Sequence, residues 1–301
     1  MTHAPGPGAS APDYRSIRYE TAGRIATITL NRPDRLNAID RTMPQEIEAA
    51  VKRANDDNAV HVIVLQGAGR AFCAGYDLQD FAEAEGTNPG VQDMPWDPML
   101  DFKFMYSNTQ AFMSLHRSYK PTIAKVRGHA VAGGSDIATC CDLIVMAEDA
   151  KIGYPPARIW GCPSVGLWVF RIGAQRAKRM LFTGDLIDGH TAVEYGLAIE
   201  TVPEAGLDAA VDALANRMAG VPKNQLMMSK LMINSALDNQ GLATTQQMAT
   251  LFDGITRHSP EGMWWKQRAE DVGFKQAVQE RDSGAPIAAE AEKTLPDWRD
   301  R

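Results

Sequence analysis

The spacing of hydrophobic positions changes twice within the first seventy residues. Segments 16–22 (SIRYETA) and 24–30 (RIATITL) are short, rich in β-forming residues and separated by Gly23, which predicts a β-hairpin. Residues 44–54 place apolar side chains at helical spacing, and 61–67 (HVIVLQG) form a short apolar run. This order predicts hairpin, helix and buried strand.

The middle of the chain continues to alternate strand and helix patterns. Residues 121–126, 143–147 and 150–154 are short apolar segments with β-branched residues. Helical spacing covers 101–118, and a second helix is expected to begin near Gly133 after a glycine turn. Alternating strands and helices with short connections predict an α/β layered domain.

After about residue 204 the pattern becomes almost wholly helical, which predicts a helical appendage and no internal repeat. The expected helices are 205–219, 222–238, 241–257, 260–270 and 274–282.

These patterns define a domain organisation. A disordered tail rich in Pro, Gly, Ala and Ser is expected over 1–13. An α/β core follows over 14–204, then a helical subdomain over 205–285 and a second tail over 286–301. Residues 81–99 contain Gly, Pro, Asp and Asn without periodicity, so we interpret them as a mobile insertion.

Composition excludes several classes of protein. The 31 basic and 37 acidic residues give a formal net charge of −6, and no basic run indicates nucleic-acid binding. Cys73, Cys140, Cys141 and Cys162 lack the spacing of a metal site. No apolar stretch has the length of a membrane span and no signal peptide begins the chain. We therefore expect a cytoplasmic protein without a metal.

Four motifs occur in an order that resembles the crotonase (enoyl-CoA hydratase/isomerase) superfamily, from about Ile17 to Asp282. They are NRPDRLNAI, FCAGYD, HAVAGGSD and MLFTGDLIDGHTAVEYGL. The resemblance implies a crotonase-type ββα spiral core with a C-terminal α-helical trimerisation subdomain. It also implies an acyl-CoA thioester as the partner, with coenzyme A as part of the substrate and no separate cofactor.

The shared device of this family is an oxyanion hole for the thioester carbonyl. By resemblance, its donors are the backbone N–H groups of Tyr76 and Gly133. Glycine at 75 and 133 lets backbone approach a ligand closely, and the helix expected behind Gly133 adds a positive partial charge. Such a donor is worth about 3 kcal/mol of transition-state stabilisation. Asp77 resembles a family aspartate that braces the first of these loops.

The carboxylates depart from the pattern of the family's hydratases, which use two glutamates. The first corresponds to Asp136, shorter by one methylene, and the second corresponds to Pro156. Asp136 is either the acid/base group or a cap on its own helix. Glu83 and Glu85 are candidates for replacing the missing carboxylate, and surface solvation is the alternative for both.

One carboxylate suits proton transfer between two carbons better than addition of water. We therefore predict an enoyl-CoA isomerase-type reaction and little straight-chain hydratase activity. The alternatives are an enoyl-CoA hydratase acting on a specialised acyl chain, an acyl-CoA hydrolase or decarboxylase, and a catalytically silent acyl-CoA-binding protein.

Further contacts are implied near the missing glutamate. Tyr154, Arg158 and Trp160 are candidates for contacting an unusual acyl group. The alternative places Arg158 in a surface ion pair and Trp160 in the core. The region 81–118 is expected to line the acyl pocket with methionines and aromatic residues, although a helix packed in the core has the same composition.

The resemblance also implies where coenzyme A binds and how the chain assembles. The nucleotide is expected to contact the backbone near Ala74 and Tyr76, and Arg35, Phe274 and Lys275 are further candidates, although each basic residue is also credible as a solvated charge. Apolar positions on the C-terminal helices predict a homotrimer or a dimer of trimers. These positions are Leu226, Leu231, Ile233 and Leu237.

Overall fold

Two β-sheets form the centre of the computed structural model, which describes residues 14–83 and 88–292. In the larger sheet only the β1–β2 hairpin is antiparallel, and the other pairings are parallel. Its strand order is β1 (Ile17–Ala22), β2 (Ile25–Leu30), β3 (Val62–Gly67), β4 (Thr122–Val126), β6 (Leu143–Ala147) and β9 (Glu200–Val202). The smaller sheet joins β5 (His129–Val131), β7 (Lys151–Gly153) and β8 (Leu186–Ile187). The predicted hairpin and the predicted strands are confirmed.

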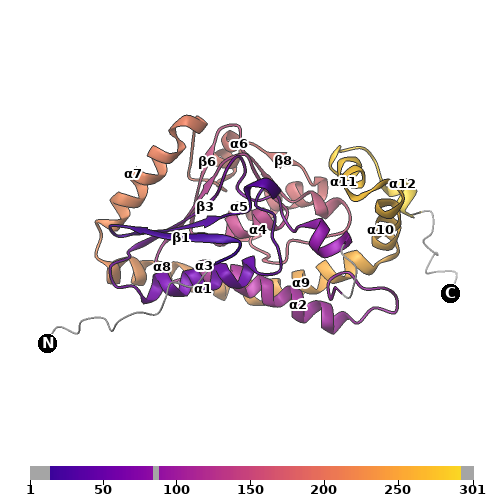
Figure 1. Cartoon of the computed structure of the whole chain (residues 1–301), viewed down its shortest axis with the longest axis horizontal. Helices are drawn as coiled ribbons and strands as arrows, with labels where there is room; N and C mark the ends of the chain where they lie inside the picture. The colour runs from indigo at the N-terminus through magenta and orange to yellow at the C-terminus, as the bar shows by residue number, and fades with distance from the viewer. Residues whose placement is uncertain (1–13, 84–87, 293–301) are drawn as a thin grey trace.

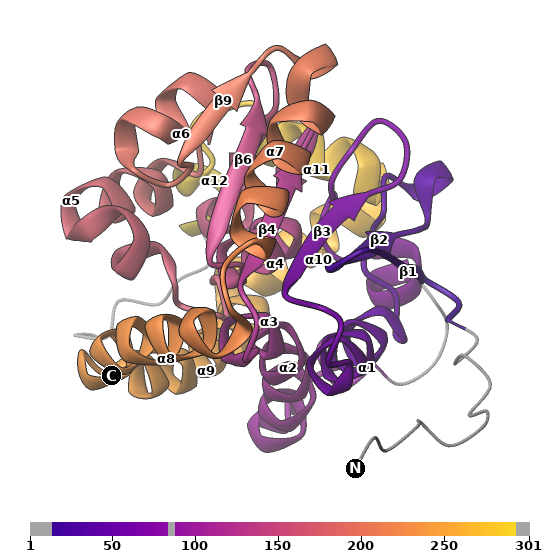
Figure 2. The same ribbon diagram turned by 90° about the vertical axis from the view of Figure 1, so that its left-hand side faces the viewer.

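Helices cover both faces of the larger sheet. A row of helices runs along one side (Figures 1 and 2), whereas α7 (Leu207–Ala219) packs on the other against β3, β4 and β6. The row consists of α1 (Met43–Asp56), α2 (Pro98–Phe112), α3 (Ser114–Arg117), α8 (Lys223–Asn239) and α9 (Leu242–His258). Because both faces are covered, β3 and β4 are apolar along most of their length.

The helix pattern expected after residue 204 is confirmed, and the predicted helix over 101–118 is divided into α2 and α3. Three helices gather at one end of the molecule in Figure 1: α10 (Pro260–Val272), α11 (Phe274–Asp282) and α12 (Ala288–Ala291). The last of these falls within 286–301, which we expected as a tail, and its Ala291 is buried. The expected tail over 1–13 lies outside the described residues.

The α/β core has three further helices, of which the first packs on β5 of the smaller sheet and the last on β9 of the larger sheet. The sequence analysis identified only the first of them. They are α4 (Gly133–Cys140), α5 (Trp168–Thr183) and α6 (Gly189–Tyr195). Arg171 shows why α5 docks here, because its guanidinium donates to the carbonyl groups of Thr139, Cys141 and Asp142 at the end of α4.

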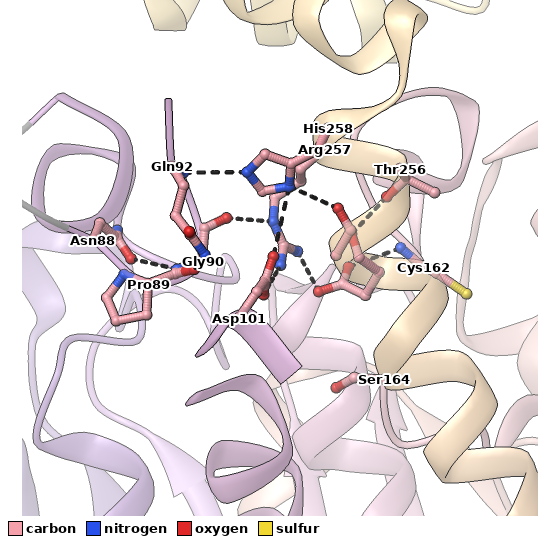
Figure 3. A network of polar contacts seen from close by, with 12 residues as sticks. Asn88, Pro89, Gly90, Gln92, Asp101, Cys162, Ser164, Thr256, Arg257 and His258 are labelled. Carbon is pink, nitrogen blue, oxygen red and sulfur yellow. Dashed lines mark hydrogen bonds and ion pairs between the residues drawn. The ribbon is translucent and has the colours of Figure 1, made fainter. Parts of the chain in front are cut away.

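The predicted insertion over 81–99 is anchored where it is described. Its first residues belong to a π-helix, η2 (Gln79–Glu83), and the segment from residue 88 makes hydrogen bonds to α9 (Figure 3). The N–H of Gln92 donates to His258 Nε2 at 3.2 Å, and Arg257 Nε donates to the carbonyl of Gly90 at 2.6 Å. Residues 88–97 are therefore attached to the C-terminal helices. The Glu83 side chain and all of Glu85 lie outside the described part.

Across residues 14–83 and 88–292, no helix combines the length and apolar character that a membrane crossing requires.

Candidate active site

Two loops meet where the oxyanion hole was predicted. Cys73 of the first loop exchanges backbone hydrogen bonds with the β5 strand, through His129 at 2.9 Å and Val131 at 3.0 Å. Gly75 adopts φ +93°, and a Cβ there would lie 2.9 Å from Ala132 Cβ and 3.5 Å from the nitrogen of Gly133. The two loops are thus in direct contact, and only a residue without a side chain fits between them.

The second loop opens α4 with an unusual backbone. Ala132 precedes the helix at φ 53°, a conformation that non-glycine residues rarely adopt. A Cβ on Gly134 would lie 2.1 Å from the carbonyl oxygen of Cys73, so close packing on the first loop requires glycine at this position.

The predicted donors are both available. Among the described residues, neither the N–H of Tyr76 nor that of Gly133 donates a hydrogen bond to another protein group. The N–H of Gly133 belongs to the first turn of α4, where backbone donors have no partner within the helix. Tyr76 and Gly133 both line one pocket, and the predicted oxyanion hole needs such free N–H donors.

The NRPDRLNAI segment holds the first loop in place. Arg32 Nη2 lies 2.9 Å from Asp77 Oδ2, and the N–H of Asp77 donates to the carbonyl of Ile39 at 2.9 Å. Asn37 donates to the carbonyls of Ala68 and Ala71 at 2.8 Å. Asp77 therefore has the bracing position that the sequence analysis expected for it.

A cavity of about 180 Å³, partly open to solvent, begins at these amides. It is concave and mostly apolar with a few polar groups, the usual character of a small-molecule site. Its apolar wall includes Leu78, Phe81, Val91, Phe104 and Met105. The region 81–118 thus contributes to the pocket, although not with all of its methionine and aromatic side chains. Met94 and Met99 are more than half exposed and lie outside this wall.

Asp136 lies on the polar wall of the same pocket. Its side chain is 2% exposed, and its Oδ1 has no hydrogen-bond partner among the described residues. Burial raises the pKa of the Asp136 carboxyl well above its ordinary value, the charge of Asp253 raises it further, and the N–H of Ser164 lowers it. Among the described residues, the Asp136 carboxyl accepts from the N–H of Ser164 and not from an N–H group of its own helix. The geometry consequently gives no support to the capping alternative.

Asp253, on α9, supplies a second carboxyl group to this pocket. Its Oδ1 accepts a hydrogen bond from the N–H of Cys162 at 2.9 Å, and its Oδ2 is paired with Arg257 Nη1. Arg257 Nη2 lies 2.6 Å from Asp101 Oδ1, so one guanidinium joins two aspartates (Figure 3). Burial and the excess negative charge raise the pKa of Asp101 to about 6.

The residues expected near the missing glutamate are divided by the fold. Tyr154, Trp160 and Pro156 line the pocket. The hydroxyl of Tyr154 donates to the carbonyl of Cys162 at 3.0 Å, so it also holds the segment that binds Asp253. Arg158 is not among the lining residues and binds the carbonyls of Thr183 and Ala285 instead.

The residues expected to bind coenzyme A are also separated. Ala74 lines the pocket beside Tyr76. Arg35 is exposed and donates to Gln79 Oε1, and Lys275 is exposed on α11. Phe274 packs inward against Trp160 and Trp265 at ring-centroid distances of 6.0 and 5.9 Å, behind the residues that line the pocket.

The sequence analysis did not identify Asp253 and Arg257. Their i, i+4 spacing was visible within the predicted helix 241–257, but this spacing is typical of many solvated helix surfaces. Only the packing of α9 beside α2 turns this face toward the pocket. Across residues 14–83 and 88–292, no cluster of three or more His, Cys, Asp or Glu has the arrangement of a metal site.

Fold and site together define an acyl-CoA enzyme of the crotonase type, and comparison with known proteins agrees. The family model described as enoyl-CoA hydratase/isomerase matches residues 20–276. The chain belongs to this family.

Solved structures and a named relative extend the likeness over most of the chain. The enoyl-CoA hydratase from Mycobacterium smegmatis is 48% identical, with a TM-score of 0.85 over 90% of this chain and 94% of that one. The enoyl-CoA hydratase/isomerase from Xanthobacter autotrophicus Py2 is 31% identical, with a TM-score of 0.82 over 91% and 100%. The crotonyl-CoA hydratase of Syntrophomonas wolfei is 29% identical over 77% of this chain and 84% of its own length. The predicted crotonase fold is confirmed.

Proposed function

We propose that the protein moves a proton at the α-carbon of an enoyl-CoA thioester, with Asp136 as the acid/base group. The N–H groups of Tyr76 and Gly133 hold the thioester oxygen while negative charge develops on it. The observation that carries this proposal is the buried, unpartnered Oδ1 of Asp136, in the same pocket as the two free amides.

The environment of Asp136 suits this chemistry. Burial raises the pKa of its carboxyl group, and a carboxylate with a raised pKa is a stronger base toward a carbon-bound proton. The two fixed N–H donors offset the cost of forming the enolate, at about 3 kcal/mol for each donor. Returning the proton to a different carbon isomerises the double bond, which is the reaction expected from the sequence and requires one carboxyl group.

Hydration of an enoyl-CoA is the second candidate. Asp253 favours it, because the pocket has a second carboxyl group despite the proline at 156. The printed names of the relatives, enoyl-CoA hydratase and crotonyl-CoA hydratase, support it too. Hydrolysis, decarboxylation and silent binding have no comparable support, although each needs the same two amides.

Binding of coenzyme A and assembly belong to the same proposal. Ala74 lines the pocket, and we expect its backbone to contact the nucleotide. Arg35 and Lys275 are exposed cations, and we expect them to bind the phosphates. Phe274 then supports the pocket wall through Trp160. We propose a homotrimer or a dimer of trimers, since α8 and α9 leave large apolar side chains exposed.

Deuterium uptake tests the proposed function. Butyryl-CoA and longer acyl-CoA thioesters are incubated with the enzyme in D2O, and the α-carbon label is measured by mass spectrometry. We expect exchange by the wild type and a decrease of about 10² to 10⁴ fold in Asp136→Ala, the usual contribution of a general base. If the wild type binds the thioester but catalyses no exchange, the proposal is wrong and the protein is a silent binding protein.

A further inference from the structure

Asp253 and Asp136 come from different elements of the fold, yet their side chains line the same pocket. Asp136 is on α4 in the α/β core, whereas Asp253 is on α9 in the helical region. Both line the pocket that also includes Pro156, the position of the missing glutamate. They are close enough for the charge of Asp253 to raise the pKa of Asp136.

The two carboxyl groups differ in their partners. Asp253 is paired with the guanidinium of Arg257 and accepts a hydrogen bond from the N–H of Cys162. Asp136 has no ion-pair partner among the described residues, and its Oδ1 is buried and unpartnered. A like charge in an apolar site disfavours ionisation, so the charge of Asp253 favours the protonated form of Asp136.

Arg257 also fixes the orientation of Asp253. Its three donor positions bind Asp253, Asp101 and the carbonyl of Gly90. Figure 3 shows Gly90 and Asp101 beside Arg257, and Asp253 binds it from one turn earlier on α9. Asp253 Oδ2 accepts a hydrogen bond from Arg257 and Oδ1 accepts one from the N–H of Cys162, and each oxygen has capacity for a second. The side chain is thus immobilised by the protein without being saturated by it.

We propose that Asp253 is the second catalytic carboxylate of this enzyme, acting as the base toward a water molecule that adds to the β-carbon of an enoyl-CoA. This inference rests on the proposed function of Asp136 and extends it from proton transfer to hydration.

The bonds and protons of the step balance. Asp253 takes a proton from water, and the water oxygen forms a bond to the β-carbon of the substrate. The π electrons of the double bond move onto the thioester oxygen, which the amides of Tyr76 and Gly133 stabilise. The enolate then collapses, and its α-carbon takes the proton of Asp136. Return of a proton from Asp253 to Asp136 through solvent restores the resting state, and dehydration is the reverse.

The test compares two reactions of one enzyme. Hydration of trans-2-enoyl-CoA thioesters of 4 to about 12 carbons reports on both carboxyl groups, whereas α-carbon exchange of the saturated thioesters reports on Asp136 alone. In Asp253→Asn we expect hydration to fall by about 10² fold or more, and exchange to stay within about tenfold. The pH midpoint of exchange should move lower, because the negative charge beside Asp136 is gone.

Asp101→Asn is the matched control. Asp101 binds the same guanidinium but is not among the residues lining the pocket. Its substitution disturbs Arg257 without removing a pocket carboxylate, so the ratio of hydration to exchange should stay near the wild-type value. An equal change of this ratio in both variants would reduce Asp253 to a structural partner of Arg257 and overturn the inference.

The remaining outcomes separate the two proposals. Wild-type exchange without hydration of any thioester in the series would overturn the role of Asp253 and leave that of Asp136. Neither exchange nor hydration would overturn both. Should Asp253→Asn fail to fold, the wild-type pH profiles decide the matter. A bell-shaped profile of kcat/KM for hydration, beside a single limb for exchange, is expected for one base and one acid, and a single limb for both would contradict the inference.

Discussion

Asp136 and Asp253 line one pocket from opposite parts of the sequence, and the charge of the second raises the pKa of the first. The relationship depends on α9, which packs beside α2 and contributes Asp253 to the pocket that the loop before α4 also lines. The helical region thus contributes directly to the pocket, in addition to any role in assembly.

Gly75→Ala should remove most of the oxyanion stabilisation. The position has φ +93°, and the added Cβ would lie 2.9 Å from Ala132 Cβ, so the two loops would be pushed apart. We expect α-carbon exchange to fall by about 10² to 10³ fold, the usual effect of losing an oxyanion donor.

The matched control for this substitution is Gly206→Ala. Gly206 has φ −93°, and a Cβ there would come no nearer than 4.0 Å to Val202. Exchange measured by mass spectrometry should be close to wild type. An active Gly75→Ala enzyme would mean that the thioester oxygen binds elsewhere.

Asp101 should make the free energy of unfolding depend on pH. Its pKa is about 6 in the folded protein, above the value of about 3.9 for an unfolded aspartate. The folded state therefore binds the proton more tightly. The stabilisation from Asp101 is full below about pH 4 and is lost as the pH rises through about 6, by up to about 3 kcal/mol.

Urea unfolding of the wild type and Asp101→Asn from pH 4 to 7 measures this effect. Other carboxyl groups titrate in both proteins, so their contributions cancel in the difference. We expect the wild type to gain stability relative to the variant at the acid end. A difference that is constant across this range would show that Arg257 keeps Asp101 ionised throughout.

Phe104→Ala should change the preference for acyl chains. Phe104 lines the pocket and its ring centroid lies 6.0 Å from that of Phe81, so its removal widens the apolar end. We expect the ratio of kcat/KM for long or cyclic over short acyl-CoA thioesters to rise by about tenfold, in the range of hydrophobic pocket discrimination.

Phe102→Ala provides the comparison on the same helix. Phe102 stacks on Tyr106 at 5.2 Å and is not among the lining residues. The ratio of the two substrate classes should not change in this variant. Equal ratios for Phe104→Ala and the wild type would place the acyl chain outside this part of the pocket.

Met232→Glu should weaken self-association. Met232 is 69% exposed on α8, and a charge at an apolar interface is costly to desolvate. We expect analytical ultracentrifugation to show a trimer or hexamer for the wild type and a smaller species for the variant. Lys52→Glu on the exposed face of α1 should keep the wild-type mass, and a monomeric wild type would contradict the prediction. The exposed apolar residues on α8 and α9 include Met228, Leu231, Met232, Ile233, Met248, Phe252 and Ile255.

Local features of the chain were sufficient to predict much of this protein. The hairpin, the buried strands and the five helices after residue 204 follow from the period of apolar residues, because that period reflects which face of an element is buried. The loops around Gly75 and Gly133 were predicted equally well, since each is a short motif next to the strand or helix that positions it. Asp136 reaches the pocket because the loop at Gly133 opens the helix on which it lies.

The tertiary structure alone decided which distant side chains complete the pocket. Pro156 indicated a missing carboxylate, but nothing in the local sequence points to Asp253, whose Asp-Arg spacing is common on solvated helices. Arg158 and Phe274 were predicted to contact the substrate from their place in the motifs. In the structure Arg158 binds the carbonyl groups of Thr183 and Ala285, and Phe274 packs against Trp265. Periodicity shows that a helix has a buried face. Which residues meet across a pocket depends on how the helices pack against one another, a long-range property that no single segment specifies.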